Sequence, residues 1–153
     1  MPERRPVAAL DDHLGYWLRI VSNRVSQNFA RKLDAEGVTV AEWVFLRVLY
    51  DFDALAPTVL AERMAMTKGA ISKLGNRLVE KRLVAREANS GDRRAQTVAL
   101  TQKGRALLPR LAKAADENDM AFFHLLTPAD RKTLDRIMRR LVELHGLKDV
   151  PTN

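Results

Sequence analysis

The sequence predicts a mainly α-helical fold with one small β-hairpin. Three observations support this fold class: two short helices joined by a tight turn within residues 57–81, a turn-rich basic segment between strand-like stretches at 83–104, and long amphipathic helices at both ends. The central pieces form a helix-turn-helix followed by a hairpin. The apolar stripes of the outer helices need a further partner.

Length and charge narrow the function. The chain has 153 residues, which suits one domain of ordinary size, and its net charge of +7 with a pI of about 10.1 favours polyanionic partners, nucleic acid before an anionic membrane surface. No apolar run approaches the ~20 residues of a membrane span, and the first ten residues lack the apolar core of a secretory signal. We therefore expect a soluble, cytoplasmic protein without membrane contact. The absence of cysteine excludes disulfides and thiol redox sensing.

The first helix is predicted from Leu14 until Gly37 stops it, because apolar residues recur there at helical spacing. A second helix is predicted from Val40 to Tyr50. Thr39, just before this helix, and Glu42, in its first turn, are predicted to form a capping box. In such a box the Thr39 hydroxyl accepts from the Glu42 backbone N–H, and the Glu42 carboxylate accepts from the Thr39 backbone N–H.

The helix-turn-helix follows after a short connector. Pro57 suits the first position of a short helix, and Thr67 can cap the next helix, from Lys68 to about Lys81. Only Ala65 and Met66 separate the two helices.

The second of these helices has two different faces. At ~100° per residue, Ile71, Leu74 and Leu78 share one apolar arc. The opposite face is small, polar and basic, and carries no acidic residue before Glu80; it consists of Gly69, Ser72, Lys73 and Asn76, flanked by Lys68 and Arg77. This face is either an ordinary solvated surface or, given its place in a helix-turn-helix, a DNA-contacting surface, which we favour.

The hairpin is predicted from strands at 83–87 and 95–100 joined by a turn at 89–92. Arg93 and Arg94 near its tip either improve solubility or, beside a helix-turn-helix, reach a neighbouring minor groove. Asp92 either pairs with one of these arginines to stabilise the wing or acts as a plain turn residue.

Two further helices complete the chain. Thr101 can cap one that ends around 122–126, and Thr127 with Pro128 begins the last one. The last helix carries a long apolar stripe, formed by Leu134, Ile137, Met138, Leu141 and Leu144.

Catalysis has little support in the sequence. His13, His124 and His145 share no metal-ligand spacing, and the chain has neither a glycine-rich phosphate loop nor a well-placed carboxylate pair. Trp17, Trp43 and Tyr50 could line a small-molecule pocket, but core packing is the better interpretation of each. We expect no enzyme activity, no cofactor and no metal.

Together these segments resemble the MarR family of bacterial transcription regulators, which are winged helix-turn-helix dimers. The resemblance covers about residues 10–145. It is carried by Leu60-Ala61-Glu62-Arg63-Met64, Thr67-Lys68-Gly69-Ala70-Ile71-Ser72-Lys73-Leu74, Leu83-Val84, Asp92-Arg93-Arg94 and Leu100-Thr101-Gln102-Lys103-Gly104. Gly75 departs from the family's expected pattern and costs about 1 kcal/mol of helix stability relative to alanine.

The resemblance implies a division of the chain. It suggests a flexible tail at 1–9, a single MarR-type domain at 10–145 and a second tail at 146–153. Within that domain, a DNA-binding winged helix-turn-helix lobe would span about 38–101. Dimerisation helices at about 10–36 and 102–145 would interlock with a second subunit, which explains their surplus apolar stripes.

The expected function is that of a homodimeric repressor on a pseudo-palindromic double-stranded DNA operator, relieved by a small aromatic or phenolic ligand, as the resemblance implies. We expect Lys68, Lys73 and Arg77 to contact phosphates, and Ser72 and Asn76 to contact base edges or phosphate. Thr67 belongs to the same surface, and Arg93 or Arg94 would enter the minor groove. The alternative is a winged-helix interaction module that binds an acidic partner. The sequence leaves open the operator, the effector, activation against repression, and any role of Arg4 and Arg5.

Overall fold

A computed structural model describes residues 7–89 and 92–152, with the backbone alone at 89 and 92–95. After a 3-10 turn (Leu10–Asp12) come the helices α1 (Leu14–Ala35), α2 (Val40–Tyr50), α3 (Pro57–Met64) and α4 (Lys68–Glu80). The strands β1 (Val84–Asn89) and β2 (Asp92–Leu100) follow, and then α5 (Gln102–Phe123) and α6 (Pro128–Leu144). The mainly α-helical class with one hairpin is confirmed.

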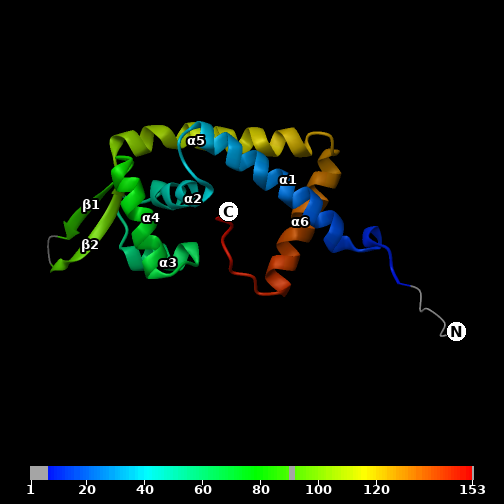
Figure 1. Ribbon diagram of the computed structural model, residues 1–153, viewed down its shortest axis with the longest axis horizontal. Coiled ribbons are helices and arrows are strands. Elements are labelled where there is room, and N and C mark those ends of the chain that lie inside the picture. Colours follow the sequence, from blue (N-terminus) through cyan, green and yellow to red (C-terminus); the bar gives the residue numbers. More distant parts are fainter. Residues whose placement is uncertain (1–6, 90–91, 153) are drawn as a thin grey trace.

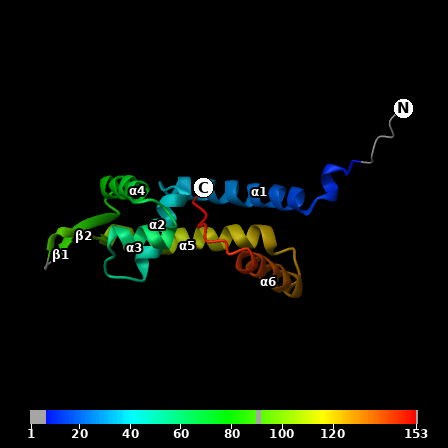
Figure 2. The same ribbon diagram turned by 90° about the horizontal axis from the view of Figure 1, so that it is seen from below.

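The long helices α1 and α5 lie side by side and run along the length of the molecule (Figures 1 and 2). The hairpin, α3 and α4 gather at one end of α5, while α6 turns away from its other end (Figure 1). The buried Asn118 of α5 links these two helices, because its Nδ2 donates a hydrogen bond to the Val25 carbonyl of α1 at 3.2 Å. Within the described residues, none of these helices is both long and apolar enough to cross a bilayer.

Side-chain caps set several helix boundaries, as the sequence predicts. Thr39 and Glu42 form the reciprocal capping box, with 3.2 Å from the Glu42 nitrogen to Thr39 Oγ1 and 3.0 Å from the Thr39 nitrogen to Glu42 Oε2. Thr67, Thr101 and Thr127 cap α4, α5 and α6, respectively. The Oγ1 atom of each accepts a hydrogen bond from the backbone nitrogen three residues on. Each cap satisfies an amide that the first helical turn leaves without a partner.

The hairpin differs from its predicted limits. Its strands reach Asn89 and Asp92, which pair with each other, so the strands extend further than the predicted 83–87 and 95–100. Regular pairing breaks between Ala88 and Asn89. The sequence also gives no sign that Leu55, in the connector before α3, forms a bridge with Val98 through backbone bonds of 2.9 and 2.8 Å. This single bridge ties the hairpin to the connector before the helix-turn-helix.

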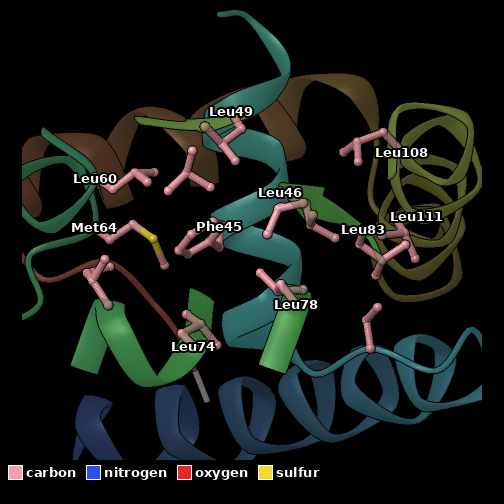
Figure 3. Close-up of a cluster of buried hydrophobic side chains, with 14 of the residues drawn as sticks. Phe45, Leu46, Leu49, Leu60, Met64, Leu74, Leu78, Leu83, Leu108 and Leu111 are labelled. Carbon is pink, nitrogen blue, oxygen red and sulfur yellow. The ribbon is translucent and has the colours of Figure 1, made fainter. Parts of the chain in front are cut away.

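The hydrophobic core lies in the central lobe, around α2. Phe45, Leu46 and Leu49 of α2 are completely buried among side chains of the neighbouring helices (Figure 3). These neighbours include Leu60 and Met64 from α3, Leu74 and Leu78 from α4, and Leu108 and Leu111 from α5 (Figure 3). Burying apolar side chains of this size contributes about 1.5–3 kcal/mol each. The apolar arc of α4 therefore faces the core, and its polar face is left outside.

The ends of the chain are packed differently from the centre. The apolar stripe of α6 is 39–68% exposed, and Trp17, Leu18 and Val21 of α1 are about half exposed. An open groove of about 930 Å³ lies between α1, α5 and α6, lined in part by Val21, Met120 and Met138. Core packing is thus wrong for Trp17 within one chain, whereas Trp43 packs on the core and edge-on against Phe29.

Candidate nucleic-acid interface

The candidate interface is the polar face of α4. Thr67, Lys68, Ser72, Lys73, Asn76 and Arg77 are all exposed. The structure brings these six predicted residues together on one side of a single helix, because Ile71, Leu74 and Leu78 hold the other side in the core. Lys68 follows directly on the cap, so cationic charge accompanies the open N–H groups of the first turn.

Thr67 combines two roles at the start of α4. Its Oγ1 accepts from the Ala70 backbone nitrogen at 3.1 Å, which fixes the first turn of the helix. The hydroxyl hydrogen is not used by that bond and can be donated outward. A phosphate oxygen at this helix end would accept from the hydroxyl and meet the positive end of the helix dipole.

A buried carboxylate anchors the other end of α4. Glu42 on α2 is 1% exposed, and its Oε2 lies 2.7 Å from Lys81 Nζ, just after α4. Its Oε1 lies 3.7 Å from Arg77 Nε. Lys81 Nζ also donates to the Gly37 carbonyl at 2.8 Å, between α1 and α2. Arg77 is therefore both a surface cation and part of a network that holds the helix in place.

Arg86 is a residue of this surface that sequence reasoning missed. It lies exposed on β1, and its Nη2 donates to Asn76 Oδ1 of α4. Strand alternation places Arg86 on the same face of β1 as the buried Val84, two residues earlier. Nothing local in the sequence, however, indicates contact with a residue ten positions earlier.

The space around Gly75 does not by itself require glycine. Gly75 faces inward, and a Cβ atom there would lie 3.6 Å from Arg86 Nη2 and 3.8 Å from Phe45 Cζ. Both are ordinary contact distances. This glycine therefore lies beneath the Arg86 guanidinium and is not part of the outward face.

The predicted roles of Asp92, Arg93 and Arg94 concern side chains outside the described part of the structure. Their backbone belongs to β2, beyond the break in regular pairing. Arg4 and Arg5 also lie outside the described residues.

The described residues hold no cluster of three or more histidine, aspartate or glutamate side chains suited to a metal. Tyr50, one of the three aromatic residues considered for a pocket, lies instead beside two guanidinium groups. Its ring centroid is 5.8 Å from Arg47 and 5.4 Å from Arg105. Trp17, Trp43 and Tyr50 do not line the groove between α1, α5 and α6.

Comparisons with known proteins agree with this architecture. Residues 36–95 match the model of the MarR family. A candidate transcriptional regulatory protein for the hcr operon of Thauera aromatica is 33% identical over 129 residues, which cover 84% of this chain and 78% of that protein.

Two solved structures are similar over most of their length. A transcriptional regulator from Pseudomonas aeruginosa has a TM-score of 0.75 and 29% identity, covering 87% of this chain and 99% of that one. BpsR of Bordetella bronchiseptica, whose DNA binding is regulated by 6-hydroxynicotinic acid, has a TM-score of 0.75 and 25% identity, covering 89% and 97%. The shared sequence and the winged helix-turn-helix geometry establish that the chain belongs to the MarR family of transcriptional regulators.

Proposed function

We propose that this protein is a homodimeric repressor that binds a pseudo-palindromic double-stranded DNA operator and is released by a small aromatic or phenolic ligand. The observation that carries the proposal is the outward face of α4, where exposed cations and short polar side chains share one side of the helix. The opposite side of α4 packs against the hydrophobic core. A helix of this kind fits the major groove. In this proposal the lobe at about 38–101 binds DNA, and repression results from covering the promoter.

The residues of α4 divide by chemistry. The phosphate contacts are assigned to the ammonium groups of Lys68 and Lys73 and to the guanidinium of Arg77. Ser72 and Asn76 offer short hydrogen-bonding groups to base edges. Arg93 and Arg94 are proposed for the adjacent minor groove, where narrow A·T-rich sequence attracts arginine.

A second copy of the chain is the proposed cover for the apolar surfaces of α1 and α6. Stripes as exposed as that of α6 are costly in water when they form a continuous patch, and such patches mark interaction sites. Two copies joined there would carry one α4 each. On an operator the two helices would enter successive major grooves about 10 base pairs apart.

The direct test measures DNA binding by retardation on the protein's own upstream region at two salt concentrations. Lys73→Ala should weaken all duplexes alike and flatten the salt dependence, because it removes a phosphate contact. Asn76→Ala should instead reduce discrimination between operator and random duplex by about 1–3 kcal/mol. Arg136→Ala is the matched control, since it removes an exposed positive charge on α6 without touching α4.

The outcomes separate the alternatives. Affinity that does not fall with salt, or that is unchanged in Lys73→Ala, would refute DNA binding through α4 and favour an acidic protein partner. Equal losses on operator and random DNA for both α4 variants would refute the division of roles.

Ligand control is tested by a thermal-shift screen of aromatic acids. A binder should raise the melting temperature and release operator DNA over the same concentration range. The regulation of BpsR by an aromatic acid supports this choice of compounds. Stabilisation without release of DNA would contradict ligand-relieved repression.

A further inference from the structure

The contact between Arg86 and Asn76 determines which atoms of Asn76 face outward. A guanidinium has only N–H donors, so the atom of the amide that meets Arg86 Nη2 must be the oxygen, Oδ1. The Nδ2 amino group then points away from Arg86. Because Asn76 is exposed on the outward face of α4, its free hydrogen-bonding group there is a donor.

Arg86 is fixed relative to α4 from two sides. Its backbone lies opposite Val98 in the hairpin, and Val98 is itself buried and bonded to Leu55 of the connector before α3. Its guanidinium lies over Gly75, where a Cβ would be 3.6 Å from Nη2. The hairpin therefore places a cation beside one position on α4.

Among the side chains that the structure describes, no carboxylate lies within ion-pair distance of Arg86. One of its five N–H donors is used by Asn76 Oδ1, and others remain for an acceptor. Asn76 and Arg86 thus form an adjacent pair that presents donors and positive charge together.

This arrangement bears on base recognition. An asparagine that reads adenine in the bidentate manner must accept from the N6 amino group and donate to N7. Here an adenine amino group would have to share Oδ1, through its second lone pair, with a guanidinium that already donates to it, so two donors would crowd one oxygen. Guanine offers two acceptors in the major groove, N7 and O6, which match two donors.

We infer that Arg86 acts as a specificity-determining positioning residue, which holds Asn76 as a donor so that the pair prefers guanine over adenine at the base that Asn76 contacts. This inference rests on the proposed function and concerns the same surface. It assigns to the hairpin a role in base choice in addition to any minor-groove contact at its tip.

The test is selection of binding sites from randomised duplexes by the full-length wild type, Asn76→Ala and Arg86→Met. The position at which Asn76→Ala changes the selected base identifies the contact of Asn76. Wild type should prefer guanine there, by about tenfold over adenine as measured with matched duplexes. Arg86→Met keeps the length of the side chain but has no donor, and should lower that ratio about tenfold while other positions keep their preferences.

A second variant covers the case in which Arg86→Met does not fold. Asn76→Asp keeps an oxygen for Arg86 but has no outward amino group, so it should lose affinity on guanine duplexes most. Lys73→Met is the control, because loss of a phosphate contact should weaken guanine and adenine duplexes equally. Circular dichroism establishes that each variant is folded.

Each result decides between the two claims. No binding of wild type to any duplex refutes the proposed function. Binding with an unchanged guanine-to-adenine ratio in folded Arg86→Met, or adenine selected by wild type, overturns the inference and leaves the proposed function intact. Equal losses of Asn76→Asp on both duplexes overturn it as well.

Discussion

Replacing Gly104 by alanine tests how closely the start of α5 packs against the backbone at Leu83, just before β1. Gly104 is buried in the first turn of α5, where a Cβ atom would lie 2.1 Å from the Leu83 carbonyl oxygen and 3.0 Å from the Leu83 carbonyl carbon. Both atoms belong to backbone, so no side-chain rotation relieves the clash. To reach ordinary contact, α5 and the segment at Leu83 must separate by roughly 1.3 Å, and packed interiors resist such movement.

The same separation disturbs two hydrogen bonds at this junction. The Thr101 nitrogen donates to the Leu83 carbonyl at 3.1 Å, and Thr101 Oγ1 donates to the Arg82 carbonyl at 2.7 Å. Overpacking costs about 1–3 kcal/mol, and each weakened hydrogen bond costs about 1 kcal/mol more. The helix preference for alanine over glycine opposes this by about 1 kcal/mol.

The expected net change for Gly104→Ala is therefore a loss of about 2–4 kcal/mol in the free energy of unfolding. For a chain of this size that lowers the melting temperature by about 4–16 °C. The assay is calorimetric or circular-dichroism melting at one fixed protein concentration, since the proposed dimerisation would make the midpoint concentration-dependent.

Gly69→Ala is the matched control. Gly69 also lies in the first turn of a helix, but nothing is within 4 Å of its added Cβ. Its melting temperature should stay level or rise by up to about 4 °C, because only helix preference acts. If Gly104→Ala is as stable as Gly69→Ala, the close backbone approach at Leu83 is wrong.

Three further variants probe other contacts. Thr39→Ala removes the side-chain acceptor for the Glu42 backbone N–H and should lower the free energy of unfolding in urea by about 1 kcal/mol. A smaller change than a few tenths of a kcal/mol would mean that the capping box contributes nothing. Lys81→Met leaves the buried Glu42 carboxylate without its 2.7 Å partner and should cost about 1.5–3 kcal/mol in the same assay, whereas an unchanged midpoint would refute the anchoring role of Glu42. Leu141→Glu adds a charge to the α6 stripe and should convert the proposed dimer to monomer by light scattering; Arg136→Glu, on the opposite side of that helix, should not, and equal effects of the two would contradict dimerisation through the stripe.

The sequence by itself predicted the helices and several of their first residues. The reason is that Thr39, Thr67, Thr101 and Thr127 act over three residues, so each cap is visible in the local sequence. The two faces of α4 follow from the helical period in the same way. Strand limits were less accurate, because cross-strand pairing extended the hairpin to Asn89 and Asp92.

Only the tertiary structure decided how the candidate interface is assembled. Glu42 meets Lys81 across 39 positions, and Arg86 meets Asn76 across ten, through packing that brings α2, α4 and β1 together. The bridge from Leu55 to Val98 likewise joins segments far apart in the chain. Such contacts depend on how elements pack rather than on residue spacing. The sequence therefore determined which side chains α4 turns outward, while the fold decided which of them are held, by what partner, and with which atom exposed.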